Sequence, residues 1–199
     1  MGECSEKIRT ALRMDTELKT FFRLDDEITL RAWEEADVEH GFETVMRNRG
    51  HLQAFMHWMT PDYSMESARK FNSEAIKKRK SRESLGLGIY RGKLLIGSIG
   101  FVGFDWKARK TDIGYWLVKE EEGKGIITRA TRMLIGYAFD ELELNRIEIQ
   151  CSSQNLRSAA VPERLGFKKE GVLRQAEFRN GQLRDFSIYG LLAQDRERV

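Results

Sequence analysis

The chain has 199 residues, of which 41% are hydrophobic and 33% are charged, and only 2 are proline. This length favours a single domain with its own hydrophobic core, and the composition excludes a disordered or fibrous chain. Lys and Arg number 34 against 31 Asp and Glu, and the net charge of +3 is too small to indicate binding to nucleic acid.

The N-terminal part of the chain predicts a strand followed by a helix. Residues 1–25 have no strong apolar period, so we expect them to be an N-terminal appendage to a single domain over residues 26–199. Residues 28–32 alternate between apolar and polar side chains, as a short strand does. Asp37 then precedes a stretch whose apolar residues recur on one helical face.

The middle of the chain predicts a second helix and then an antiparallel meander. Ser64 is a suitable N-cap for a helix over residues 65–80. Residues 85–90, 94–104 and 111–118 have the composition and alternation of strands separated by short turns.

The rest of the chain continues with a helix of about four turns over residues 127–138, which follows a polar, glycine-containing turn at residues 120–125. The last expected elements are a strand, a helix and a pair of strands, over residues 145–151, 156–165 and 167–192, with the pair joined at Asn180-Gly181. This order predicts a mixed α/β (α+β) domain in one piece and not an alternating Rossmann pattern.

The most informative segment is the run IGYWLVKEEEGKGII over residues 113–127, in which a predicted strand enters a glycine turn that starts a helix. Backbone amides and the positive end of the helix dipole converge at such a turn and favour binding of phosphate. Gly123 and Gly125 let the backbone approach a diphosphate with no Cβ in the way. The same glycines also suit a solvated turn before an ordinary amphipathic helix, and their spacing fits neither the P-loop nor the dinucleotide-binding fingerprint.

Three blocks together resemble the GNAT superfamily of acyl-coenzyme A N-acyltransferases, and within it the ribosomal-protein N-terminal acetyltransferases of the RimJ/RimL type. The blocks are IGYWLVKEEEGKGI, NLRSAAVPERLGF and EGVLRQAEFRNGQLRDFSIYGLL, and the likeness covers about residues 28–192. The resemblance implies a GNAT-like central sheet, twisted, mostly antiparallel and flanked by helices. It also implies a splay between the strands that end near Val118 and begin near Asn145, with the pantetheine arm of coenzyme A between them.

The resemblance further implies that acetyl-coenzyme A is the cosubstrate and that main-chain amides hold its diphosphate. Glu122 stands where the superfamily usually has Arg or Gln, and Ile127 where it often has Gly or Ala, so we expect Glu122 to point outward. A backbone amide near Leu117 or Val118 is expected to bind the thioester carbonyl. The residues implied to bind the cosubstrate are Leu117, Val118, Gly123, Lys124, Gly125, Ile126, Ile127, Thr128 and Asn155.

Two residues align with the catalytic groups of the RimL-like enzymes. Glu177, in RQAEF, matches the proposed general base, directly or through a water, and Ser158, in NLRS, matches the residue that protonates the departing thiolate. Other interpretations stay open: Glu177 as an exposed strand glutamate, and Ser158 and Asn155 as residues that cap a helix start. Pro162 removes the backbone donor to the Ser158 carbonyl, which predicts an irregular helix.

The cysteines and histidines suggest neither a disulfide framework nor a metal site. Cys4 and Cys151 lie far apart without a CxxC spacing, and His40, His51 and His57 have no ligand spacing. We therefore expect no metal and a reducing cytoplasm. No apolar run approaches the length of about 18 residues that a membrane span needs, and the charged start of the chain does not resemble a signal peptide.

Three functional hypotheses follow. The first is direct transfer of acetyl in a ternary complex to a protein N-terminal α-amine, ribosomal or other, with no acyl-enzyme. The second is a small amine acceptor such as an amino acid, a polyamine or an antibiotic, and the third is a non-catalytic acyl-coenzyme A sensor. The loop over residues 52–65 and the Asn180 hairpin decide between the first two hypotheses.

The resemblance also implies a homodimer. Four aromatic residues either line an acceptor pocket or belong to the core, namely Trp58, Tyr63, Trp106 and Trp116.

Overall fold

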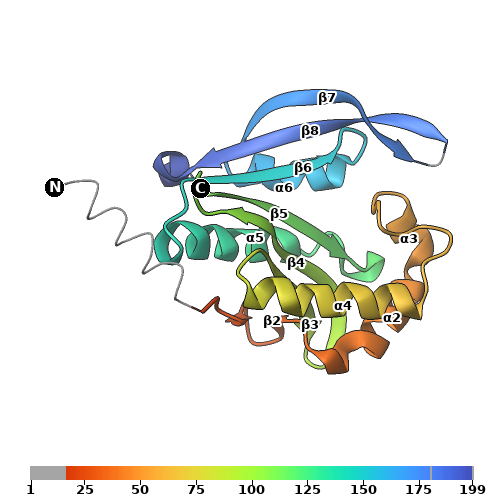
Figure 1. Ribbon diagram of the computed structural model, residues 1–199. Helices are drawn as coiled ribbons and strands as arrows, with labels where there is room; N and C mark the ends of the chain where they lie inside the picture. The colour runs from red at the N-terminus through yellow and green to blue at the C-terminus, as the bar shows by residue number, and fades with distance from the viewer. Residues whose placement is uncertain (1–16, 180, 199) are drawn as a thin grey trace.

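The computed structural model describes residues 17–179 and 181–198 (Figure 1). Within this part of the chain, eight strands form one sheet in the order β1-β2-β3-β4-β5-β6-β8-β7. Neighbouring strands are antiparallel except for β5 and β6, which are parallel. The expected mixed α/β fold with a mostly antiparallel sheet flanked by helices is confirmed.

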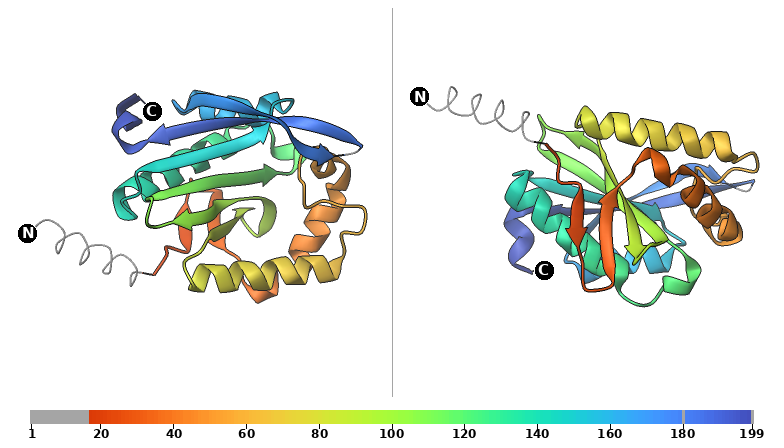
Figure 2. Two further views of the ribbon diagram at one scale, coloured as in Figure 1. Left: turned by 45° about the horizontal axis from the view of Figure 1, so that its top comes forward. Right: turned by 90° about the horizontal axis from the view of Figure 1, so that it is seen from below.

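The strands are β1 (Phe21–Arg23), β2 (Ile28–Ala32), β3 (Leu85–Arg91), β4 (Leu94–Asp105), β5 (Lys110–Leu117), β6 (Arg146–Ser152), β7 (Lys168–Arg179) and β8 (Gln182–Leu192). The α-helices are α2 (Val38–Arg47), α3 (Arg49–Gln53), α4 (Met65–Lys80), α5 (Ile126–Gly136) and α6 (Leu156–Arg164). Shorter helical turns are η1 (Glu35–Asp37), η2 (Lys119–Glu121), η3 (Tyr137–Glu141) and η4 (Ala193–Arg198). Helices α2 and α4 lie on one face of the sheet, and α5 and α6 lie on the other (Figure 2).

Helix α4 shows how local chemistry sets an element's start. Ser64 accepts a hydrogen bond from the Ser67 amide, and the Ser67 hydroxyl accepts one from the Ser64 amide, both at 3.3 Å. This reciprocal capping satisfies donors that the first turn leaves unpaired. The predicted helix over residues 65–80 and its N-cap are confirmed.

Strand β1 was not expected, because three residues are too few to show an alternating pattern. It pairs with β2, and its Phe22 packs edge-to-face on Tyr137 with ring centroids 5.2 Å apart. The sheet therefore includes part of the segment 1–25, of which residues 1–16 lie outside the described residues. The predicted helix over 127–138 also differs, since α5 ends at Gly136 and a wider π turn, η3, follows.

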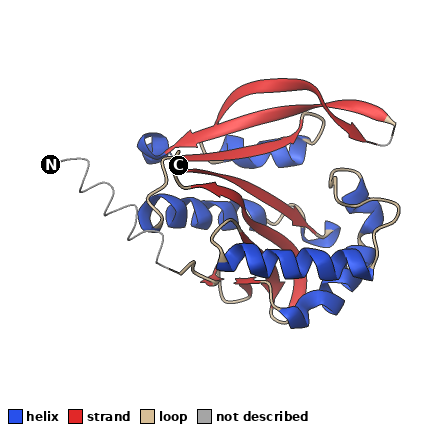
Figure 3. Cartoon of the chain, in the orientation of Figure 1, coloured by secondary structure: helices blue, strands red, loops and turns tan. Residues whose placement is uncertain are grey.

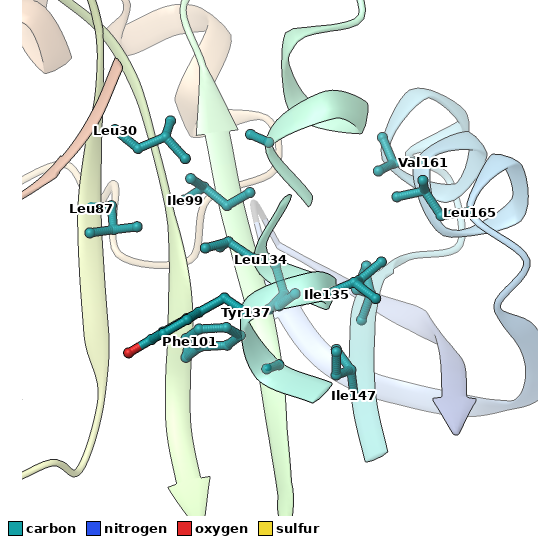
Figure 4. Close-up of a cluster of buried hydrophobic side chains, with 14 of the residues drawn as sticks. Leu30, Leu87, Ile99, Phe101, Leu134, Ile135, Tyr137, Ile147, Val161 and Leu165 are labelled. Atoms are coloured by element: carbon teal, nitrogen blue, oxygen red, sulfur yellow. The ribbon is translucent and has the colours of Figure 1, made fainter. Parts of the chain in front are cut away.

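The main core lies between the sheet and the helices α5 and α6. Figure 4 shows apolar side chains from these elements, including Leu30, Leu87, Ile99, Phe101, Leu134, Ile135, Tyr137, Ile147, Val161 and Leu165. The burial of this face fixes α5, and with it the turn before α5, against β4 and β5.

Strands β5 and β6 pair only where they begin. Their register runs from Lys110 opposite Arg146 to Asp112 opposite Glu148, and beyond that point they diverge to Leu117 and Ser152 (Figures 1 and 3). The predicted splay between two middle strands is confirmed. The predicted hairpin of β7 and β8 forms the far edge of the sheet, and Asn180 at its tip lies outside the described residues.

Candidate active site

The turn between β5 and α5 brings backbone amides together at the start of a helix. Gly123 and Gly125 have φ values of 77° and 70°, in the left-handed region that glycine adopts without a Cβ clash. The Arg129 amide makes a bond to the Gly125 carbonyl at 3.0 Å, so the amides of residues 126–128 precede the helical ladder. Together with the helix dipole, they give this turn the geometry and charge that favour an anion.

An ion-pair network braces the turn. Glu121 is only 8% exposed, and it accepts hydrogen bonds from the Arg91 guanidinium at 3.1 and 2.8 Å. The Lys124 ammonium lies 3.1 Å from the same carboxylate. Arg91 lowers the pKa of Glu121, and Lys124 lowers it further. The Lys124 side chain is therefore engaged within the turn, and the turn offers a ligand mainly its backbone amides.

Glu122 does not point freely outward as expected. It forms an ion pair with Arg157 of α6, and its Oε1 lies 3.4 Å from Nε2 of His51 on α3. The Glu122 carboxylate thus links three segments that are far apart in the sequence. This pairing offsets a negative charge that would otherwise repel a diphosphate beside the turn.

The amides at the end of β5 face different ways. The Val118 amide donates to the Ile96 carbonyl of β4 at 2.8 Å. Because successive amides along a strand point to opposite sides, the Leu117 amide faces the splay. Of the two donors considered for the thioester carbonyl, Leu117 is thus the one directed into the splay.

Ser158 and Tyr115 are joined across the splay. The Tyr115 hydroxyl donates to the Ser158 carbonyl at 3.1 Å and accepts from the Ser158 hydroxyl at 3.2 Å. Since Pro162 has no amide to offer that carbonyl, the tyrosine supplies the missing donor. The Asn155 side chain accepts from the Ser158 amide at 3.1 Å, so the capping role considered for Asn155 is confirmed. Sequence reasoning missed Tyr115, which occupies an ordinary strand position.

Cys151 lies on β6 beside Ser158 and is buried. Burial raises the pKa of its thiol, although a hydrogen bond with the Ser158 hydroxyl works in the opposite direction. A neutral thiol is a poor nucleophile. This environment agrees with a mechanism that has no cysteine nucleophile.

A cavity of about 860 Å³ passes through the splay. The side chains of Tyr115, Cys151, Asn155 and Ser158 line it near α6, while Asp112, Trp116 and Gln150 line it nearer α2 and α4. Ser158 and Asn155 are the predicted site residues among its lining. The other predicted residues, Leu117, Val118, Glu177 and the turn over residues 123–128, are outside that lining.

Glu177 lies on β7 with its side chain 13% exposed, in an ion pair with Arg179. The alternative of an exposed strand glutamate is therefore wrong. Its Oε2 is buried and has no hydrogen-bond partner among the described residues. Arg179 does line the cavity, so the ion pair connects Glu177 to its wall.

Asp112 is a carboxylate of the cavity wall that sequence reasoning missed. Its Oδ1 is buried and finds no hydrogen-bond partner in the described part of the chain. Burial raises the pKa of Asp112, and the neighbouring Glu148 carboxylate raises it further. Alternation along the strand places Asp112 opposite the core face, where sequence alone does not distinguish a cavity from solvent.

Residues 27–168 match the sequence model of the family described as acetyltransferase (GNAT) domain. The chain belongs to the GNAT acetyltransferase family. It is 39% identical over 180 residues to the putative ribosomal N-acetyltransferase YdaF of Bacillus subtilis (strain 168), which covers 88% of this chain and 96% of that protein. It is 30% identical over 167 residues to the ribosomal-protein-serine acetyltransferase of Escherichia coli (strain K12), which covers 84% and 93%.

A solved structure agrees with these relatives. RimL, a ribosomal L7/L12 alpha-N-protein acetyltransferase in complex with coenzyme A, superposes with a TM-score of 0.83 at 26% identity, over 86% of this chain and 97% of that one. The predicted resemblance to the RimJ/RimL-type enzymes is confirmed, and the GNAT protein described here is an acyltransferase.

Three of the four aromatic residues left open by the sequence line the cavity of this GNAT enzyme. Trp58 lies between Tyr63 and Trp116, with ring centroids 5.8 and 6.2 Å away. Trp106 instead stacks on Phe104 at 4.6 Å, outside the cavity lining. The loop over residues 52–65 therefore contributes an aromatic wall.

Neither a metal-ligand cluster nor a helix that could span a membrane is present among the described residues. No group of three or more His, Cys, Asp or Glu side chains there is placed to hold a metal ion. None of the helices in the described part is long and apolar enough to cross a membrane.

Proposed function

We propose that this enzyme transfers the acetyl group of acetyl-coenzyme A to a primary amine in the cytoplasm, foremost the α-amine of a protein N-terminus such as that of a ribosomal protein. The observation that carries the proposal is the cavity through the splay, which has Ser158 on one side and Asp112 on the other. The coenzyme A in the RimL structure and the names of the relatives support the same reading.

The residues present suit acetyl-coenzyme A. Amides of residues 123–128 would hold the diphosphate, the Leu117 amide would face the thioester carbonyl, and the splay would admit the pantetheine arm. Asn155, already a helix cap, has amide hydrogens left for a pantetheine carbonyl. The thioester supplies an activated acyl carbon.

Acetyl transfer requires a neutral amine, because an ammonium has no lone pair. The amine nitrogen forms a bond to the acyl carbon while the carbon–sulfur bond breaks, and the amine loses one proton. An acceptor that arrives as an ammonium first releases one proton to solvent. We assign the proton lost during transfer to Glu177, directly or through a water, and assign the proton that the departing thiolate gains to the Ser158 hydroxyl, which regains one from solvent. An amide at Leu117 would stabilise charge on the acyl oxygen by about 3 kcal/mol.

Two carboxylates near the cavity have separate roles in this scheme. Glu177 accepts the proton, while Asp112, on the cavity wall, holds the incoming ammonium. Glu177→Ala should then lower kcat by about 10²-fold and leave coenzyme A affinity nearly unchanged. Asp112→Asn should instead mainly raise KM for the amine. Unaltered turnover in Glu177→Ala would remove Glu177 from the mechanism.

The proposal is tested by mixing the purified protein with acetyl-coenzyme A and a panel of N-terminal peptides and small amines, and by following release of free thiol. Peptide-dependent release is the expected result. Release only with amino acids, polyamines or antibiotics would move the function to small-molecule acetylation. Binding of coenzyme A with no release for any amine would leave a non-catalytic sensor.

We also propose a homodimer. Phe178 and Leu183 are directly opposite each other on β7 and β8, and they are 71% and 56% exposed. Large apolar side chains at a sheet edge favour a protein partner. Sedimentation equilibrium should give twice the monomer mass, and Phe178→Ser should shift the population to monomer. A monomer in the unmodified protein would refute the dimer.

A further inference from the structure

A lane without side chains crosses the sheet under α2 and α4. Gly86 of β3 is directly opposite Gly100 of β4, which is directly opposite Gly114 of β5. All three glycines line the cavity and are called the glycine lane below. Two strand spacings separate its ends, a length of about 10 Å. A Cβ on Gly100 would collide with the Leu85 carbonyl, so close strand pairing keeps the centre of the lane bare.

The far end of the lane has an unused hydrogen-bond donor. Trp33 is 5% exposed, lines the cavity, and has an indole Nε1 with no partner among the described residues. That nitrogen lies 3.4 Å from the position a Gly86 Cβ would take, and Phe71 of α4 meets the indole edge-to-face at 6.1 Å. A buried donor without a partner is costly, and a ligand oxygen at this point would satisfy it.

The near end of the lane has an unused acceptor. Asp112 precedes Gly114 by two residues on β5, so both face the same side of the sheet. The buried Oδ1 of Asp112 finds no partner in the described chain. An ammonium group beside Gly114 would meet this oxygen.

The charges around the cavity fit one positive charge and not several. Asp37 also lines the cavity, but Arg31 already binds both of its oxygens, at 2.6 and 2.7 Å. Glu74 of α4 is accompanied by Lys78 one helical turn later, and both line the cavity. Glu148, beside Asp112, already pairs with Arg146 at 2.8 Å, and Arg179 of the cavity wall is paired with Glu177. Asp112 is thus the carboxylate with an oxygen left for a monovalent cation, whereas a polyamine needs several such groups.

We propose that the glycine lane binds an aromatic ring attached to the acceptor amine, with the ammonium at Asp112 and a ring hydroxyl at the Trp33 indole. An aromatic ring is flat enough to lie on the bare backbone of Gly100 and Gly114, with its edge toward the Trp33 indole, which lies over Gly86. This chemistry is that of an N-terminal tyrosine. The inference rests on the proposed acetyl transfer to an amine and names the acceptor for it.

The first test compares kcat/KM for short peptides that differ only in residue one, either tyrosine, phenylalanine or serine, together with tyramine and spermidine. The tyrosine peptide should exceed the serine peptide and spermidine by about tenfold or more. Tyramine carries the same ring on a small amine, so its rate shows whether the ring must belong to a peptide. Equal rates, or faster turnover of the serine peptide or spermidine, would overturn the lane and leave acetyl transfer standing.

Binding gives a readout that does not depend on turnover. Calorimetry of the tyrosine peptide with the coenzyme A-bound protein should show association that Trp33→Phe weakens about tenfold, while affinity for the phenylalanine peptide changes little. If the peptide binds in this Trp33-dependent way but no thiol is released, the proposed function fails and the lane stands. Absence of binding would overturn the lane.

A matched pair of glycine variants locates the ring. Gly114→Val places a side chain in the lane, where the nearest atom is a movable Val102 methyl at 3.0 Å, and it should abolish the preference for tyrosine over serine. Gly103→Val lies outside the cavity lining in open space and should retain the preference. Circular dichroism checks that both fold. An unchanged preference in Gly114→Val would place the ring elsewhere.

Discussion

At the scale of residues, one proline and one tyrosine act together. Pro162 deprives the Ser158 carbonyl of its helical donor, and the Tyr115 hydroxyl replaces that donor at 3.1 Å. The hydrogen bonds between Tyr115 and Ser158 tie α6 to β5 across the splay and set the position of the Ser158 hydroxyl. In the proposed reaction the thioester lies between β5 and β6, beside this link.

This link predicts a coupling between the two residues. Tyr115→Phe should lower the free energy of unfolding by about 1 kcal/mol, because the Ser158 carbonyl loses its donor. In a Pro162→Ala background the loss should be smaller, since position 162 then has its own amide hydrogen. Urea unfolding of the four proteins measures the coupling, the difference between the two losses, for which we expect about 0.5 kcal/mol. Equal losses in both backgrounds would contradict the link.

The burial of Asp112 predicts that the carboxylate proposed to bind the amine lowers the stability of the folded protein. Burial and the nearby Glu148 raise its folded-state pKa, so the stability it contributes is present at acid pH and is lost as pH rises through that value. Asp112→Asn should therefore have a larger free energy of unfolding than the unmodified protein at pH 7. This difference should disappear in acid, where the Asp112 carboxyl is protonated. It should also raise KM for the amine by about tenfold.

Urea unfolding at several pH values checks the stability part of this prediction. The control is Asp26→Asn, since the Asp26 side chain is 98% exposed. A loss of stability at pH 7 in Asp112→Asn would show that the carboxylate is paired in the folded protein, contrary to its unsatisfied oxygen.

At the scale of elements, the turn before α5 depends on Glu121. Its carboxylate binds Arg91 of β3 and Lys124 of the turn, and these partners lower its pKa. Glu121→Ala should cost on the order of 2 kcal/mol by urea unfolding, because Arg91 loses a buried partner. Glu120→Ala, at an exposed neighbouring position, is the matched control and should change stability little.

The sign of the pH dependence follows from the lowered pKa of Glu121. Its stabilisation is present above the carboxyl's unfolded pKa and is lost as pH falls through the lower folded value. The difference between Glu121→Ala and Glu120→Ala should therefore shrink in acid. A constant difference would indicate that Glu121 acts through packing and not through its charge.

Some elements were predictable because their signals are local. Helix α4 has a serine cap at its start, and β2 alternates over its full length. The glycines of the turn before α5 indicate its positive φ angles. Strand β1 and the cavity carboxylate Asp112 were not predictable. The first depends on pairing with β2, and the second depends on α2 and α4 covering a face that would otherwise be open to solvent.

In the molecule as a whole, the splay between β5 and β6 opens a cavity through the sheet. Because β5 and β6 part after Glu148, the two faces of the sheet communicate through the cavity. One side of the cavity offers Ser158, and the other offers Asp112 and the aromatic wall. This arrangement lets a thioester and an amine approach from opposite sides without sharing a pocket. This arrangement suits the direct transfer in a ternary complex that we propose.

The proposed reaction depends on backbone amides of residues 123–128 that hold the anionic end of the acyl carrier. Calorimetry of the purified protein with acetyl-coenzyme A and with acetyl-pantetheine, which lacks the diphosphate, tests it most directly. We predict that acetyl-coenzyme A binds at least about tenfold more tightly, a difference of about 1.4 kcal/mol or more. Equal affinities, or no association with acetyl-coenzyme A, would contradict the account.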